Sequence, residues 1–127
     1  SQLYKRLITL KQQNISTTIG LIADQTPPPE SAYWTKFLNQ DTPVFNGTEK
    51  LAKKFNYPVV YLNIKKVKRG YYHLSTTVIT ENPKENAEGE ISELHTRHLE
   101  KNIQDQPYTW LWSHRRWKHK KPAELRG

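Results

Sequence analysis

The sequence contains no cysteine and no methionine among its 127 residues. Without cysteine it cannot be a disulfide-stapled scaffold, a zinc module with cysteine ligands or an enzyme with a cysteine nucleophile. Because a natural open reading frame begins with methionine and this chain begins with Ser1, we expect it to be part of a longer protein. Long apolar runs are also missing. The longest uncharged stretch, residues 12–23, is far shorter than the roughly 20 residues of a membrane-spanning helix.

Acidic residues are the scarcer charge, with 12 Asp and Glu against 20 Lys and Arg and a formal net charge of +8. The mean hydropathy is low, at −0.89. Four Trp, seven Tyr and three Phe are nevertheless too many for a disordered tail. We therefore expect a folded unit with a polar surface. Its positive charge favours an anionic partner, such as nucleic acid, an anionic membrane surface or a phosphorylated small molecule; the alternative is a solvated surface that is merely basic.

The spacing of apolar residues predicts an α/β fold, with a partial mixed sheet and flanking helices. The strands at 17–23 and 58–64 flank one helix, which predicts a right-handed βαβ unit with parallel strands. The second of these strands turns at Gly70 into a third, which is a hairpin signal. The Asp-Thr-Pro run at 41–43 is typical of a helix start. The predicted helices cover residues 2–13, 43–55 and 90–104, and the predicted strands cover residues 17–23, 33–38, 58–64 and 71–79.

Asp24 is the first candidate for a functional residue. It ends the apolar run at 17–23, and ligands of open α/β sheets bind beyond the carboxyl ends of strands. A carboxylate there can orient a base, bind a hydroxyl or meet a cation. The alternative is a structural Asp that ends the strand and caps the turn before the three prolines at 27–29.

The second candidate is the run Trp-Leu-Trp-Ser-His-Arg-Arg-Trp-Lys at residues 110–118. Arginine binds phosphate with two parallel hydrogen bonds, and tryptophan favours boundaries between apolar and wet surroundings. Mixed Trp and Arg therefore suit an anionic ligand at a membrane or nucleic-acid surface. The alternative is a segment that docks its tryptophans in the core and leaves a charged tail exposed.

His95 and Glu100 have the H-x4-E spacing of a catalytic pair that many acyltransferases use. On a helix, positions i and i+5 are about 140° apart, so these two side chains are not expected to converge. His95 and His98 could face one metal ion, but the sequence offers no evident third ligand, and we expect neither a metal site nor a cofactor. It also lacks a Ser-His-Asp triad, a glycine loop for phosphate and any known nucleic-acid motif.

Several segments occur in an order that resembles the C-terminal half of the bacterial lipid A biosynthesis acyltransferases, within the lysophospholipid acyltransferase superfamily. The resemblance covers most of the chain, from Leu3 to Lys118. The stretch at 33–45 is similar to the Bacteroidetes branch. The segments are Ile-Gly-Leu-Ile-Ala-Asp-Gln at 19–25, Gly-x3-Leu-Ala-Lys-Lys at 47–54, Tyr-Pro-Val-Val at 57–60 and, most specific, Pro-x2-Trp-Leu-Trp-x-His-Arg-Arg-Trp-Lys at 107–118.

The resemblance implies a transferase at the cytoplasmic face of the bacterial inner membrane. Such enzymes move a fatty acyl chain from acyl-carrier protein or coenzyme A to a hydroxyl of a lipid A precursor. In the family, the histidine of an H-x4-D/E motif is the general base and the acid orients it. That motif precedes the Ala-Asp-Gln strand end, yet none of the 23 residues before Asp24 is a histidine. We therefore expect residues 1–127 to be the C-terminal region of such an enzyme, soluble without its membrane helix and inactive alone.

Matched residue by residue, Asp24 corresponds to the strand-end Asp that the family has near its active site, where it could be a supporting acid, and Gln25 follows it. Arg115 and Arg116 match the basic ending, and their charge favours binding of phosphate or of a membrane surface, with a structural role as the alternative. We predict that these four residues bind substrate. The segment at 47–49 lies where the superfamily has an acceptor-binding or helix-packing motif, but it lacks the Pro-Glu-Gly-Thr form, so we assign it no substrate role. The implied partners are the acyl donor, the lipid A precursor and an anionic membrane surface, with no nucleic acid.

A second hypothesis comes from a different class of protein. A basic nucleic-acid-binding module could stack bases on Tyr71, Tyr72 and the tryptophans of 110–118, and hold phosphates with the arginines. The absence of a known motif counts against this hypothesis.

Overall fold

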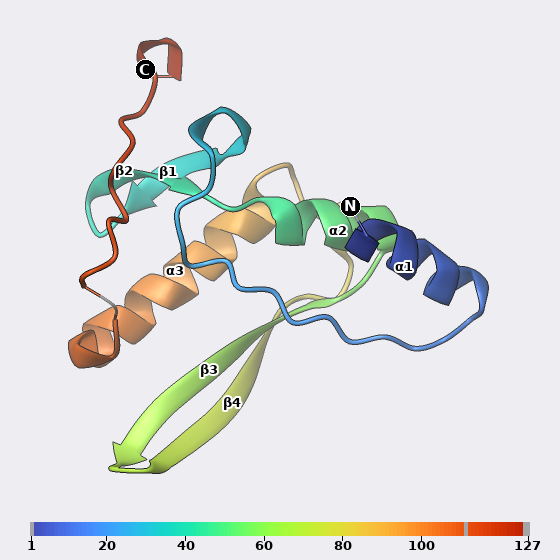
Figure 1. Cartoon of the computed structure of the whole chain (residues 1–127), viewed down its shortest axis with the longest axis horizontal. Helices are drawn as coiled ribbons and strands as arrows, with labels where there is room; N and C mark the ends of the chain where they lie inside the picture. The colour runs from blue at the N-terminus through green and yellow to red at the C-terminus, as the bar shows by residue number, and fades with distance from the viewer. Residues whose placement is uncertain (1, 111, 126–127) are drawn as a thin grey trace.

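The computed structural model describes residues 2–110 and 112–125. It contains three α-helices and four β-strands, joined by loops and short 3-10 turns (Figure 1). The mixed α/β class is confirmed, as are the first and last helices and the hairpin. The elements are α1 (Gln2–Gln12), β1 (Tyr33–Phe37), β2 (Gln40–Val44), α2 (Gly47–Phe55), β3 (Val59–Lys68), β4 (Tyr71–Thr80) and α3 (Glu90–Asp105).

The four strands form two separate antiparallel pairs, β1 with β2 and β3 with β4. The first pair turns through Leu38 and Asn39, which have φ angles of 50° and 64°. Positive φ at both central residues is the geometry that suits a two-residue hairpin. The second pair is much longer and projects away from the rest of the molecule (Figure 1).

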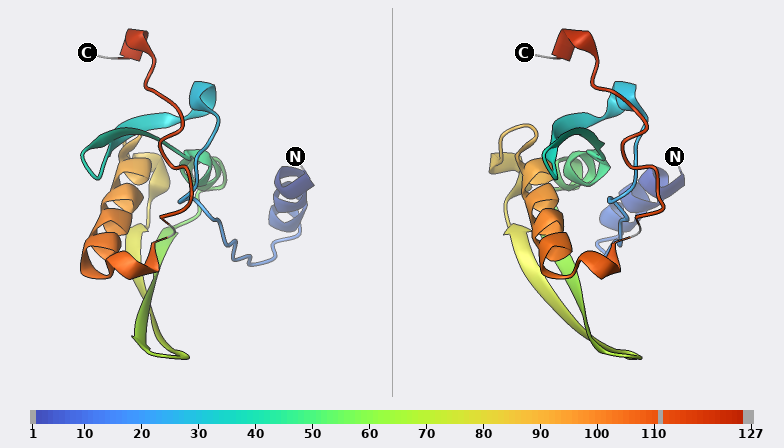
Figure 2. Two further views of the ribbon diagram at one scale, coloured as in Figure 1. Left: turned by 60° about the vertical axis from the view of Figure 1, so that its left-hand side comes forward. Right: turned by 90° about the vertical axis from the view of Figure 1, so that its left-hand side faces the viewer.

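Helix α3 lies between the two hairpins, with β1 and β2 on one side and β3 and β4 on the other (Figure 2). One core cluster joins α2, the start of β3 and the start of α3 through Ala52, Val59 and Ile91, with Ile79 packed against it. Helix α1 contacts α2 through Tyr4, whose ring packs edge to face on the Phe55 ring, with ring centroids 5.7 Å apart. The core thus collects around α2 and α3.

The predicted strand at 17–23 is wrong, and with it the parallel βαβ unit. These residues form an extended coil in which Ile22 is 81% exposed. A buried parallel strand needs a neighbour to pair with, and residues 17–23 pair with none of the described strands, although β3 and β4 each have a partner on only one side. The β-branched composition of these residues is typical of a strand, but no described strand lies beside them to pair with.

The predicted start of the middle helix is also wrong. The Asp-Thr-Pro run belongs to β2, where Pro43 lies opposite Trp34. Proline is tolerated there because β2 has a partner on only one side. The helix begins at Gly47 and ends at Phe55, followed by Asn56 in the left-handed conformation that commonly ends a helix.

Candidate substrate-binding site

Asp24 and Arg116, which are far apart in the sequence, lie together in the structure. The link between their segments is Thr26, whose Oγ1 donates a hydrogen bond to the carbonyl oxygen of Arg116 at 3.0 Å. The same hydroxyl lies 3.5 Å from the ring Nε2 of His114. The coil after Asp24 is thereby fastened to the basic segment at 114–116.

Arg116 is buried, with only 2% of its surface exposed. Its guanidinium carbon lies 5.8 Å from the centre of the Phe37 ring. Burial lowers the pKa of Arg116 to about 10, while the nearby charge of Asp24 acts in the opposite direction. The guanidinium therefore remains charged at neutral pH, held by an aromatic face and the field of one carboxylate.

The hydrogen-bonding capacity of this pair is incomplete. Arg116 Nε and Nη1 and Asp24 Oδ1 are buried and have no hydrogen-bond partner among the described residues. Tyr61 lies close enough that the Asp24 charge adds to the effect of burial in raising the pKa of its hydroxyl. Since buried polar groups are normally paired, these atoms are free to contact a group that the described chain does not supply.

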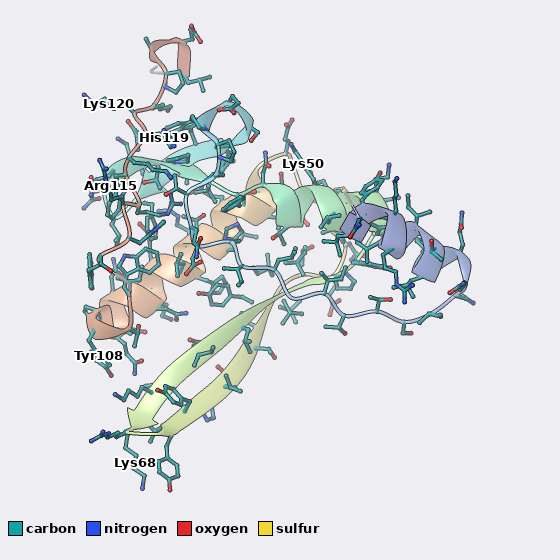
Figure 3. All side chains as sticks on the ribbon, in the orientation of Figure 1. Lys50, Lys68, Tyr108, Arg115, His119 and Lys120 are labelled. Carbon is teal, nitrogen blue, oxygen red and sulfur yellow. The ribbon has the colours of Figure 1, made fainter. Side chains whose placement is uncertain are left out.

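The other two predicted binding residues are placed differently. Gln25 and Arg115 are both exposed. Arg115 lines a shallow depression with Trp112, His114 and Lys118, and it belongs to the same C-terminal segment as His119 and Lys120 (Figure 3). The structure thus brings the partly exposed Asp24 and the buried Arg116 together and leaves Arg115 at the surface beside them.

The tryptophans of the run at 110–118 differ in packing, so some fit a surface that binds a ligand and others fit a segment docked in the core. Trp110 and Trp117 pack on Phe37, with ring centroids 5.9 and 6.1 Å away. Trp117 also donates its Nε1 hydrogen to Thr42 Oγ1 at 2.8 Å. Trp112, in contrast, is 58% exposed, and Leu111 lies outside the described residues. Two tryptophans therefore anchor the segment to the core, and a third remains available at the surface.

His95 and Glu100 engage different partners, as their helical spacing predicted. His95 is buried, and burial lowers its pKa although a hydrogen bond with the Phe45 backbone and the nearby Glu49 and Glu93 oppose this. Glu100 accepts a hydrogen bond from the Leu38 backbone at 2.8 Å and binds Arg97. Glu100 therefore fixes the β1–β2 turn on α3.

The second histidine of this helix is also accounted for. His98 stacks on Tyr61, with ring centroids 5.3 Å apart. No cluster of three potential metal ligands occurs in the part of the chain that the structure describes.

Glu49 has a role that the sequence pattern did not reveal. The residue is 5% exposed, and its carboxylate accepts backbone hydrogen bonds from Gly89, Ile91 and Ser92 at 2.9 to 3.2 Å. These N–H groups lie at the start of α3, where a helix leaves its donors unsatisfied and attracts negative charge. The only signal in the sequence is that α3 begins after Gly89, which has no side chain to cap it.

The helices and the two antiparallel strand pairs define a mixed α/β class of fold, but they do not identify a family. The family follows from comparison of the sequence with known families: the model for bacterial lipid A biosynthesis acyltransferases matches residues 4–119. The chain therefore belongs to this family, and its general role is that of a lipid A acyltransferase. Comparisons with curated proteins and with solved structures give no significant match. Within residues 2–110 and 112–125, no helix combines the length and apolarity needed to cross a bilayer.

Proposed function

We propose that this chain is the C-terminal region of an enzyme that moves a fatty acyl chain from acyl-carrier protein or coenzyme A to a hydroxyl of a lipid A precursor. The enzyme works at the cytoplasmic face of the bacterial inner membrane. The family match over residues 4–119 supports the transferase role. The buried Arg116 and the buried Oδ1 atom of Asp24, both incompletely paired among the described residues, support a substrate site at the junction of their segments.

In this proposal the catalytic base comes from outside the chain. No histidine precedes Asp24, where the motif of the family lies, and the H-x4-E pair at 95–100 is divided between the buried His95 and a Glu100 that binds Leu38. The acceptor hydroxyl gives its proton to that base as its oxygen attacks the thioester carbonyl carbon, the carbon–sulfur bond breaks, and the thiol leaves with a proton. The chain alone is expected to be inactive.

Asp24 and Arg116 act as positioning residues in this proposal. Asp24 compensates the charge of Arg116, and the hydrogen bond from Thr26 to the carbonyl oxygen of Arg116 holds the basic segment at 114–116 in place. This arrangement presents the exposed Arg115 to a phosphate of the substrate or of the acyl donor, which a guanidinium binds with two hydrogen bonds. Gln25 extends from the same segment as a neutral polar contact.

The test is acyl transfer by the full-length protein, measured by mass spectrometry of the lipid product. Arg115→Gln should raise KM about 10- to 100-fold, because a hydrogen bond to a charged group contributes about 1.5–3 kcal/mol. Asp24→Ala should lower kcat through misplacement of the segment, with rescue by Asp24→Glu. Lys101→Gln is the matched surface control. Normal transfer by Asp24→Ala at an unchanged protein level would refute the role of Asp24.

A further inference from the structure

The β3–β4 hairpin has one face that nothing in the described chain covers. The other face contacts α3: Tyr61 stacks on His98, and Asn102 donates a hydrogen bond to the Tyr61 hydroxyl at 2.9 Å. Directly opposed residues of an antiparallel pair share a face. The residues that alternate with Tyr61 therefore point away from α3, and they are Val60, Leu62, Ile64, Lys66 and their partners Val78, Thr76, Leu74 and Tyr72.

This outer face is a continuous apolar strip. Val60, Leu62, Ile64, Leu74 and Val78 are each more than half exposed. Contiguous apolar surface of this kind is uncommon on a free protein surface and marks contact with another molecule or a membrane. The strip begins where the hairpin leaves the core at Val59 and Ile79 and extends toward the tip.

The tip of the hairpin identifies the chemistry of the partner. The residues from Val59 to Thr80 include no Asp or Glu, whereas Lys65, Lys66, Lys68 and Arg69 surround the turn. Two exposed tyrosines, Tyr71 and Tyr72, follow them. Lys68 Nζ lies 4.4 Å from the centre of the Tyr71 ring.

Aliphatic side chains, interfacial tyrosines and a purely basic tip are the combination that binds an anionic bilayer surface. Both hairpin edges carry backbone groups that need water or a partner, so the hairpin fits the headgroup region and not the hydrocarbon core. We propose that the outer face and tip of β3–β4 dock on an anionic lipid surface. Lys68 lies far from Arg115 and Lys120 (Figure 3), so this is a second basic surface, separate from the C-terminal segment.

The first experiment measures partitioning of the 127-residue chain onto phosphatidylcholine vesicles with and without phosphatidylglycerol. Removing three charges in Lys66→Gln/Lys68→Gln/Arg69→Gln should weaken binding to anionic vesicles about 100-fold, since each basic residue near such a surface contributes roughly fivefold. Lys5→Gln/Lys50→Gln/Lys101→Gln removes the same net charge elsewhere and should change binding less than about threefold. Equal losses in both variants would overturn the proposal.

A second experiment reports which face touches lipid. Because the chain has no cysteine, an environment-sensitive fluorophore can be attached to a single Leu74→Cys or Ser75→Cys substitution. These adjacent positions point to opposite faces, so anionic vesicles should shift the emission of the label at position 74 to the blue and leave that at position 75 nearly unchanged. An equal response of the two labels, or none, would overturn lipid docking.

Other occupants of the strip give different results. A shift at position 74 that grows with protein concentration in the absence of lipid would identify a second copy of the chain. A shift already present in the full-length lipid-free protein would identify another part of that protein. Tighter binding of a single-stranded oligonucleotide through the same tip would identify nucleic acid. Each of these results would replace the lipid proposal, and none depends on acyl transfer, so the proposed function is tested separately.

Discussion

Glu49 and Arg116 are both charged and both buried, but their surroundings differ. The Glu49 carboxylate accepts three backbone hydrogen bonds and joins α2 to the start of α3. The Arg116 guanidinium has an aromatic neighbour and a nearby carboxylate, yet two of its nitrogens have no hydrogen-bond partner among the described residues. A buried charge with its hydrogen bonds complete stabilises the fold, whereas one left incomplete is available for another purpose.

The largest effect is expected from Glu49→Ala. This substitution removes the acceptor of three buried N–H groups, and each unsatisfied group costs roughly 1–3 kcal/mol if water does not replace it. With partial solvation of the new cavity, the free energy of unfolding should fall by about 2–4 kcal/mol. Urea denaturation followed by circular dichroism measures the change.

The matched control for this prediction is Glu88→Ala, which removes the same side chain from an exposed position in the preceding loop. Its effect should stay within about 0.5 kcal/mol, as is usual at the surface. If the two variants lose equal stability, Glu49 is not the cap of α3 and the contrast with Arg116 disappears.

The next largest effect is expected from Gly89→Ala, which tests the same junction from the backbone side. Gly89 has a φ of 84°, and a Cβ there would lie 2.6 Å from Cε2 of Tyr33. Both the left-handed conformation, which costs an L-residue about 1–2 kcal/mol, and this clash oppose the substitution, so a loss of about 2–3 kcal/mol is expected.

Gly70→Ala separates the two contributions. Gly70 has a similar φ of 78°, but an added Cβ would have no neighbour within 4 Å. Only the conformational cost of about 1 kcal/mol should remain, as measured by thermal or urea denaturation. A Gly89→Ala variant no less stable than Gly70→Ala would show that Tyr33 can move away without cost.

The local pattern of the sequence was sufficient for those elements that local interactions determine. Helix α3 has apolar residues at helical spacing, and β3 and β4 are joined by a turn at Gly70, so both were predicted within a few residues. The strand at 17–23 was wrong because pairing depends on a neighbour that composition cannot specify. The Asp-Thr-Pro run at 41–43 was misread because the same residues suit a helix start and an edge strand.

The candidate functional residues also differ in how far the sequence could predict them. Asp24 could be proposed because it follows an apolar run, and Arg116 because it lies in a run of Trp and Arg. The sequence does not show that Arg116 is buried and Arg115 exposed, because this difference follows from the packing of Arg116 on Phe37. Glu49 was missed because its partners are backbone N–H groups about 40 residues away, and a backbone donor has no sequence signature.

The effect expected at His95 is smaller. This residue lies at the junction of α2 and α3, close to Glu49. Burial lowers its pKa, while Glu49 and Glu93 oppose this, and its Nε2 has no hydrogen-bond partner among the described residues. The folded state therefore binds a proton at His95 less readily than the unfolded chain, in which a histidine has a pKa near 6.5. This contribution is fully present above that pH and is lost as the pH falls below it.

Between pH 7.5 and 5.5 the free energy of unfolding should fall through His95, because the unfolded chain takes up a proton in this range more readily than the folded chain does. Urea denaturation across this range should show a steeper dependence on pH for the parent chain than for His95→Leu. Parallel pH profiles would mean that His95 titrates equally in the folded and unfolded states.

The smallest change in stability is expected at Arg116, where the contrast with Glu49 is sharpest. Arg116→Met keeps the contact with Phe37 and removes a buried charge whose hydrogen bonds are incomplete. It leaves Asp24 without its counter-charge, but Asp24 is partly exposed to water, so the free energy of unfolding should stay within about 1 kcal/mol of the parent value. Asp24→Asn should instead destabilise the parent by about 1 kcal/mol, because it leaves the guanidinium uncompensated, and this loss should vanish in the Arg116→Met background. A double-mutant cycle measured by urea denaturation gives this coupling directly. A loss of several kcal/mol for Arg116→Met alone would show that Arg116, like Glu49, is a charge that stabilises the fold. It would also remove the physical reason for a substrate site at Asp24.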